Sequence, residues 1–129
     1  MDNNTNFVEF NDVERIWAIG SIHSNLKSFV SIKDYILKNF KKRDKLIFLG
    51  NVIGLGDYSK EIISSILKLR FDLMAKFKLN PEDVVFLRGA QEEMFSKILQ
   101  LHTAPNPGEI IKWVFDHGVD KTLKSYGFS

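Results

Sequence analysis

The sequence predicts an α/β fold in which strands and helices alternate in the order βαβαβα and the strands form a parallel sheet. Three short runs rich in Ile, Val, Leu and Phe each stop at a glycine, and a segment with helical spacing of apolar residues follows each run. Strands that are apolar on both faces are typical of parallel sheets, whose right-handed crossovers place helices against them.

Each element follows from its local pattern. The apolar runs predict strands at Ile16–Gly20, Lys45–Gly50 and Val84–Gly89. The helical spacing predicts helices at Leu26–Phe40, Ser59–Phe77 and Glu92–Leu101. Asn80 and Pro81 form a stop before the third strand. We expect a loop at His102–Gly108 and one more helix within residues 109–129.

The length and composition fit one domain that spans residues 1–129. With 129 residues, 44% hydrophobic and eleven Phe, the chain can bury about two-thirds of its unfolded surface. The sequence opens on the polar stretch MDNNTNFVEF. We therefore expect residues 1–15 to form a flexible N-terminal extension.

Charge and apolar patterning exclude several function classes. The 18 basic and 16 acidic residues leave a net charge of +2, too even a balance to indicate a nucleic-acid partner. No apolar run approaches the roughly 18 residues that a membrane span requires, so a membrane partner is not expected. The chain has no cysteine, which excludes disulfides and thiolate metal sites. We expect a cytoplasmic protein.

Three polar loops follow the predicted strands directly. They span Gly20–Ser24, Gly50–Gly56 and Arg88–Glu92. The carboxyl ends of parallel strands lie along one edge of a sheet, where ligands bind. The sequence therefore predicts that the three loops meet at this edge.

The three loops resemble the signature motifs of the calcineurin-like metallophosphoesterases, in the branch of bacterial serine/threonine protein phosphatases and diadenosine tetraphosphate hydrolases. Members read Gly-Asp-x-His-Gly, Gly-Asp-x-x-Asp-Arg-Gly and Arg-Gly-Asn-His-Glu. In the same places this chain reads GSIHS, GNVIGLG and RGAQE, framed by WAIG, KLIFLG, VVFLRG and EEMF. The resemblance runs from about Ile16 to Gly127 and implies the first half of the family's four-layer α/β sandwich.

The resemblance implies a metal site that has lost most of its ligands. Ser21 stands where the family has its first metal-binding Asp, Asn51 where the bridging Asp lies, and Ala90 where an Asn binds metal. His23 alone matches. Two adjacent divalent ions need anionic oxygens between them. We therefore expect no bound cofactor, whereas the family uses two divalent metals such as Mn, Fe or Zn.

The positions that the resemblance assigns to catalysis are altered as well. Gln91 replaces the histidine that assists the leaving group, and Leu55 replaces the phosphate-binding Arg. Arg88 and Glu92 match, and we interpret them mainly as loop architecture. The family's further histidine ligands lie in a second half that this chain does not match. We interpret His23 as a remnant ligand, now a loop histidine hydrogen-bonded to backbone.

The sequence thus predicts a catalytically degenerate, truncated metallophosphatase-like domain, and four interpretations of its role stay open. The first is a pseudophosphatase that binds a partner, and the second is a functionless remnant. The third is a weakly active phosphoesterase of the phosphatase or diadenosine tetraphosphate hydrolase type. The fourth is a phosphate- or nucleotide-binding module built on the glycine-rich loop Gly50–Gly56. That loop fits neither the dinucleotide fingerprint nor the P-loop.

One partner is expected from topology alone. Successive right-handed crossovers that advance the same way place their helices on one face of the sheet, so the other apolar face stays open to water. Exposed apolar strips of that kind mark interfaces. We expect a homodimer or a protein partner on the open face, unless a helix around Ile110–Phe115 folds back to cover it.

Overall fold

The computed structural model describes residues 7–128, so residues 1–6 of the expected N-terminal extension lie outside it, as does Ser129. Strand β1 (Arg15–Ile19) begins one residue inside the stretch for which the sequence predicts a flexible extension. The chain reaches the sheet earlier still, because Glu14 N donates to Arg43 O over 3.0 Å.

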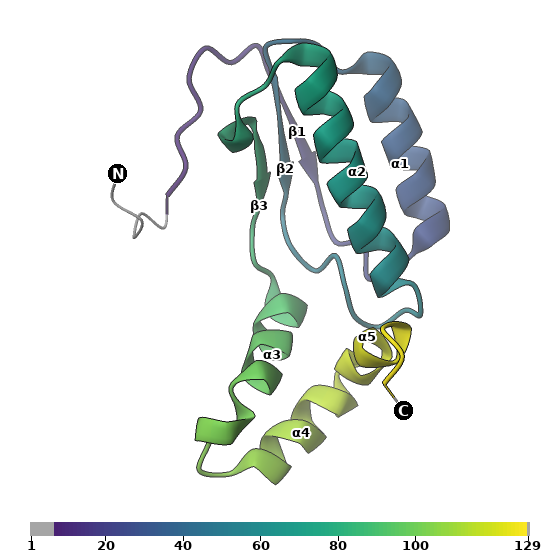
Figure 1. Ribbon diagram of the computed structural model, residues 1–129, viewed down its shortest axis with the longest axis vertical. Helices are drawn as coiled ribbons and strands as arrows, with labels where there is room; N and C mark the ends of the chain where they lie inside the picture. Colours follow the sequence, from purple (N-terminus) through teal and green to yellow (C-terminus); the bar gives the residue numbers. More distant parts are fainter. Residues whose placement is uncertain (1–6, 129) are drawn as a thin grey trace.

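The sheet is parallel, with strand order β1-β2-β3, which confirms the predicted βαβαβα arrangement (Figure 1). The other strands are β2 (Asp44–Phe48) and β3 (Val84–Phe86). Strand β3 is shorter than predicted because the chain turns toward its next helix. One more hydrogen bond, from Leu87 N to Phe48 O at 2.8 Å, continues the ladder beyond it.

Helices α1 (Leu26–Asn39) and α2 (Ser59–Phe77) lie side by side on one face of the sheet (Figure 1). Each turns a periodic apolar stripe toward the strands, as amphipathic helices do. The fully or almost fully buried side chains of this layer are Phe29, Ile36, Leu46, Phe48, Ile62, Ile66, Leu69 and Leu73. The core therefore lies between the sheet and these two helices.

The C-terminal part forms a second group of helices at the carboxyl end of the sheet (Figure 1). Its members are α3 (Ala90–Leu99), α4 (Pro107–Asp116) and α5 (Val119–Ser125), with single 3₁₀ turns at Pro81–Asp83 and Leu101–Thr103. The prediction of one tail helix was wrong, because Gly118 breaks the segment with a φ of 87°. The predicted loop is also shorter, since α4 starts at Pro107, a favoured first helical residue.

In the described part of the chain, no helix covers the face of the sheet opposite α1 and α2, which is half-buried at its centre, at Ile47 and Val85, and exposed around it. We call it the open face, and its residues are Ile16, Ala18, Ile47, Leu49, Val85 and Leu87. Ile16 is 54% exposed, and Leu49 and Leu87 are each 49% exposed. Helix α4, which contains the segment expected as a cover, packs against α3 and α5 instead. No helix within residues 7–128 is long and apolar enough to cross a membrane.

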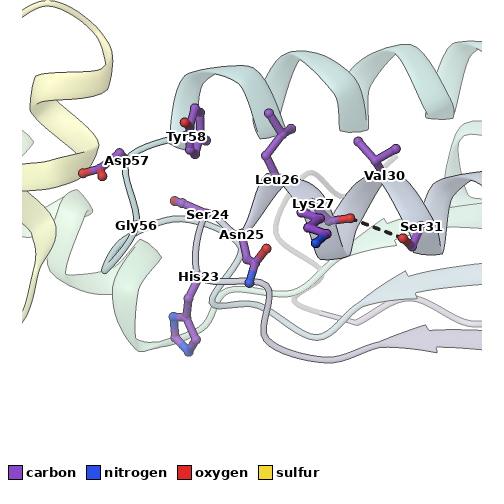
Figure 2. A pocket seen from close by; sticks show the side chains of 10 residues that line it. All are labelled: His23, Ser24, Asn25, Leu26, Lys27, Val30, Ser31, Gly56, Asp57 and Tyr58. Carbon is purple, nitrogen blue, oxygen red and sulfur yellow. Dashed lines mark hydrogen bonds between the residues drawn. The ribbon is translucent and has the colours of Figure 1, made fainter.

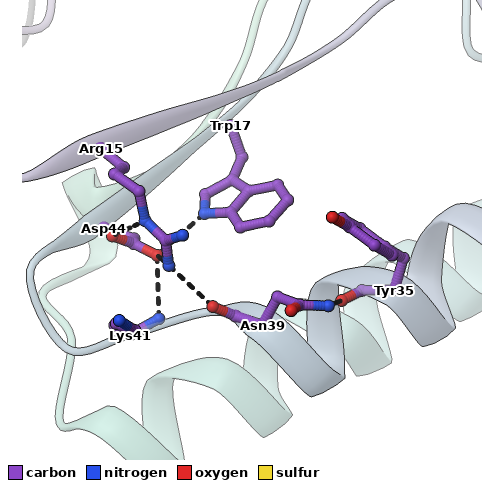
Figure 3. Close-up of polar contacts among 6 residues, drawn as sticks. All are labelled: Arg15, Trp17, Tyr35, Asn39, Lys41 and Asp44. Atoms are coloured by element: carbon purple, nitrogen blue, oxygen red, sulfur yellow. Dashed lines mark hydrogen bonds and ion pairs between the residues drawn. The ribbon is translucent and has the colours of Figure 1, made fainter.

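A buried carboxylate ties together the amino ends of β1 and β2 (Figure 3). Asp44 is fully buried. Its oxygens accept hydrogen bonds from Arg15 Nε at 3.1 Å, Arg15 Nη2 at 2.6 Å, Trp17 Nε1 at 2.9 Å and Lys41 N at 2.9 Å. Arg15 also donates to Asn39 O at 2.7 Å, at the end of α1. The cluster therefore fixes the β1–β2 register and the turn between α1 and β2.

The environment lowers the pKa of Asp44. Burial acts to raise it, but hydrogen bonds from Arg15, Trp17 and Lys41, together with the charge of Arg15, outweigh burial. A carboxylate whose pKa is lower in the folded than in the unfolded chain stabilises the fold above its unfolded pKa of about 3.9, and that stabilisation is lost as the pH falls through the folded pKa.

We predict that Asp44→Asn lowers the free energy of unfolding by about 2 kcal/mol near neutral pH, because an amide cannot accept from all of these donors. The difference from the unchanged protein should shrink progressively as the pH falls below the unfolded pKa of about 3.9, because the unfolded chain then binds a proton that the folded carboxylate still resists. Urea unfolding at several pH values measures this. Asp34→Asn, at an exposed position of α1, is the matched control, and an Asp44→Asn effect independent of pH would contradict the prediction.

Candidate functional site

The three post-strand loops meet at the carboxyl edge of the sheet. Loop 1 (residues 20–25) follows β1, loop 2 (49–58) follows β2 and loop 3 (87–89) follows β3. Ile22 N and His23 N both donate to Asn51 O, over 3.0 and 2.9 Å, and Ser24 N donates to Val52 O over 2.9 Å. Loop 1 is therefore bonded directly to loop 2.

Loops 2 and 3 approach each other through two glycines. A Cβ added to Gly89 would lie 2.5 Å from Asn51 N, and one added to Gly50 would overlap the backbone of Gly89. Gly50 also has a φ of 96°, a conformation that residues with a side chain rarely adopt. Any side chain at either position would separate the two loops.

Four residues other than glycine take the left-handed backbone conformation in these loops. Their φ angles are 48° at His23, 59° at Ser24, 53° at Asn51 and 64° at Leu55. This conformation costs about 1–2 kcal/mol per residue, less for Asn, and it persists only where surrounding contacts enforce it. Ser24 stands where the resembled motif has glycine, the residue that adopts this conformation most readily.

Glu92 joins loop 2 to loop 3 from the first turn of α3. Its Oε2 accepts from Asn51 N at 2.8 Å and Gly89 N at 3.1 Å, and its Oε1 accepts from Val52 N at 2.8 Å. In return, Asn51 Oδ1 accepts from Gln91 N at 3.0 Å. We call this set of bonds the Glu92–Asn51 bracket. Charged acceptors facing backbone N–H groups at a helix N-terminus are stabilising.

The residues present do not fit the two-metal site that the resemblance implies. Asn51 Oδ1, at the position of the bridging carboxylate, is neutral and already accepts the Gln91 N–H. Ser21 and Ala90 lie at exposed positions. The hydroxyl group of Ser21 is a poor metal ligand, and the methyl group of Ala90 cannot bind a metal at all. Within the described range, no three His, Cys, Asp or Glu side chains are grouped so that they could hold a metal ion.

The two altered positions that the resemblance assigns to catalysis, Gln91 and Leu55, contact the C-terminal helices. Gln91 is 5% exposed, and its Nε2 donates to His117 O over 2.8 Å. Leu55 N donates to Gly118 O over 3.3 Å. Both residues therefore anchor the junction between α4 and α5. Arg88 lies apart from them in an exposed ion pair with Glu93 at 3.2 Å.

A buried chain of hydroxyl groups forms a second link to the C-terminal helices. Ser24 Oγ hydrogen-bonds Ser59 Oγ, which in turn lies 3.2 Å from Thr122 Oγ1 and accepts from Gly54 N over 3.3 Å. Sequence reasoning missed Ser59 and Thr122. One signal was available, because Ser59 precedes Ile62 and Ile66 at helical spacing and so falls on the apolar stripe of α2.

A pocket of about 740 Å³ opens beside loop 1, between the N-termini of α1 and α2 (Figure 2). Leu26, Val30 and Tyr58 line its apolar part, and Lys27 and Asp57 bring opposite charges to it. Lys27 would attract an anion and Asp57 would repel it. The pocket therefore has no net preference for a phosphate.

The expected bond between the His23 ring and backbone is not what the structure contains. The backbone N–H of His23 makes the bond to loop 2, while its ring Nδ1 is buried without a partner among the described residues. Figure 2 shows the ring pointing away from Leu26 and Val30. The left-handed turn at this residue directs the ring to that side.

A scan against models of known protein families and a search of curated proteins found no match to this chain. A relationship to the metallophosphoesterases therefore rests on the three motifs and their framing residues.

We predict that Glu92→Gln lowers the free energy of unfolding by about 2 kcal/mol, because the amide loses the negative charge and turns an NH₂ group toward backbone donors. Urea unfolding measures the change. Glu93→Gln is the matched control, because the Glu93 carboxylate lies next to Glu92 in the chain but is exposed and pairs with exposed Arg88. This substitution should lower the free energy of unfolding by less than about 0.5 kcal/mol. Equal effects of the two substitutions would show that the bracket does not stabilise the loops.

Proposed function

We propose that this protein is a catalytically degenerate metallophosphatase-like protein, a pseudophosphatase that keeps the loop scaffold of that family and acts by binding rather than by hydrolysis. The observation that carries the proposal is the role of Asn51. The resemblance places it at the position of the carboxylate that bridges two metals, and its side-chain oxygen accepts the Gln91 N–H at the start of α3.

The chemistry of the substituted positions supports the loss of catalysis. Two divalent ions a few ångströms apart need negative charge between them to offset their repulsion. An amide at position 51 supplies none, and Ser21 does not replace the second missing carboxylate. The leaving-group position is occupied by a buried glutamine, which lies too deep to meet a substrate.

A binding role is favoured over a functionless remnant by the contacts of the substituted residues. The side chains of Asn51 and Gln91 each make a defined hydrogen bond, one to the start of α3 and the other to the C-terminal helices. A cytoplasmic location is part of the proposal, and a sequence without cysteine is compatible with a reducing compartment.

The glycine-rich loop is a poor candidate for a nucleotide phosphate. Phosphate-binding loops present free backbone N–H groups to the ligand. Here Asn51 N and Val52 N donate to Glu92, Gly54 N donates to Ser59 Oγ, and Leu55 N donates to Gly118 O. A phosphate would have to displace these bonds.

We predict that the purified protein takes up less than about 0.1 equivalent of manganese, iron or zinc at micromolar metal, because one imidazole and one engaged amide are too few ligands. Elemental analysis after incubation and desalting measures this. It should also fail to hydrolyse p-nitrophenyl phosphate or diadenosine tetraphosphate. One ion per chain, or turnover that disappears in His23→Ala, would contradict the proposal and favour a weakly active enzyme.

We predict that restoring the motifs raises metal affinity without restoring catalysis. The variant Ser21→Asp, Asn51→Asp, Ala90→Asn, Gln91→His rebuilds the first-half ligands that the resemblance implies, and the carboxylate introduced at position 51 can still accept the N–H of residue 91. Calorimetry with manganese should show binding at least about tenfold tighter than in the unchanged chain, since two carboxylates are added. Turnover should stay low, because the family's remaining histidine ligands have no counterpart here. Robust turnover by this variant would refute that part of the proposal.

A further inference from the structure

Strand β3 leaves one edge of the sheet unpaired among residues 7–128, because the strand order is β1-β2-β3 (Figure 1). The bond from Leu87 N to Phe48 O shows that Leu87 turns its backbone toward β2. Backbone groups alternate in direction along a parallel strand, so Phe86 turns its N–H and C=O away from β2. An added extended chain satisfies free backbone groups of this kind.

An apolar pocket of about 190 Å³ lies beside this edge, between β3 and α2. Phe86 and Leu67 are 43% and 47% exposed, so the rim of the pocket is open to water. Phe48 and Ile66 also line it and are almost fully buried. Glu92 is the charged residue of the lining, and its two oxygens already accept backbone N–H groups of loops 2 and 3. The pocket therefore suits an aliphatic side chain from outside.

Arg70 brings an unpaired positive charge to the amino end of the same edge. It lies on α2, and its Nη2 donates to Pro81 O, just before β3, over 3.0 Å in a solvent-exposed bond. Its Nε has no hydrogen-bond partner in the described range. None of the ion pairs formed by the described residues involves Arg70. A guanidinium group matches the geometry of a carboxylate, so an acidic side chain from outside would complete this site.

The spacing between the pocket and Arg70 fits an extended chain. From Ile66 to Arg70, one turn of α2 advances about 6 Å along the helix. Alternate residues of a strand share a face and lie about 6.8 Å apart. An extended segment beside β3 would therefore reach the pocket with one side chain and Arg70 with the side chain two positions away.

The charge of Arg70 distinguishes this edge from the outer edge of β1. A pocket of about 390 Å³ lies beside β1 and is flanked by Trp17 and Tyr35. The guanidinium group next to it belongs to Arg15, which stacks over Trp17 and is already paired with Asp44 at 2.6 Å. The β1 edge therefore offers an acidic partner no free positive charge of this kind.

We propose that the outer edge of β3 binds an extended segment of a partner protein, which adds a strand to the sheet, inserts an aliphatic side chain into the pocket and places an Asp or Glu carboxylate on Arg70. Backbone hydrogen bonds along an edge strand supply affinity, and side chains at alternate positions supply selectivity. None of the substituted loop positions lines the pocket, so this site is independent of the proposed function.

Two short peptides with blocked ends test the site, Thr-Thr-Asp-Thr-Ile-Thr-Thr for a parallel added strand and its reverse, Thr-Thr-Ile-Thr-Asp-Thr-Thr, for an antiparallel one. In an NMR titration of the isotope-labelled protein, at least one peptide should bind with a dissociation constant of about 50–500 µM. The amide signals of Phe86 and Arg88, whose N–H groups point outward, should shift most and exchange more slowly with solvent. Replacing Asp by Asn in that peptide should weaken binding at least about tenfold.

Arg70→Glu should weaken binding of the acidic peptide at least about tenfold, because it reverses the charge that faces the peptide carboxylate. Lys68→Glu is the matched control, since it changes the net charge equally on the same helix, where the Lys68 side chain is 77% exposed and pairs with Asp72. It should change the dissociation constant less than about twofold. Leu67→Asn, at the rim of the pocket, should also weaken binding and provides a second variant if Arg70→Glu does not fold.

Circular dichroism confirms that each variant folds. Amide signals of Phe86 and Arg88 that stay in place with both peptides at about 1 mM would overturn the proposal. Equal shifts at Ala18 would overturn it as well, because its N–H points to the outer edge of β1 and the peptide would then add to any free edge. Equal dissociation constants for Arg70→Glu and Lys68→Glu would show that Arg70 does not select the carboxylate, which also contradicts the proposal.

Discussion

The arrangement of the loops depends on the carboxylate of Glu92. Three backbone N–H groups from two loops, at Asn51, Val52 and Gly89, converge on its two oxygens. Since parallel strands end at one edge of the sheet, their loops bring backbone donors together there, and such donors need acceptors when they are shielded from water. Glu92 supplies those acceptors from the first turn of α3, where the helix dipole also favours a negative charge.

The positions that the resemblance assigns to metal binding and catalysis make structural contacts in this chain. Asn51 holds the start of α3, while Gln91 and Leu55 hold the junction between α4 and α5. The Gln91 amide is buried and donates to His117 O, so it is fixed in place and shielded from substrate. These contacts explain how a loop scaffold of this kind stays well formed without the charge that metals would require.

The sheet is covered unevenly, and this has a topological cause. Strand order β1-β2-β3 with two right-handed crossovers places both α1 and α2 on the same face. The C-terminal helices pack against the loops and α2 rather than crossing to the other side. The core between sheet and helices is complete, whereas Ile16, Leu49 and Leu87 stay about half exposed.

The sequence by itself determined the order of strands and helices and the meeting of three loops at one edge, because apolar periodicity and glycine positions are local properties. It also showed that positions 21 and 51 carry no carboxylate, where the resembled motifs have one. It predicted the one-sided cover of the sheet from handedness alone. Only the tertiary structure decided that Asn51 caps α3, that Gln91 is buried against His117, and that Ser59 meets Thr122. These contacts join residues 26 to 63 positions apart, and no local pattern encodes which distant donor a polar side chain will meet.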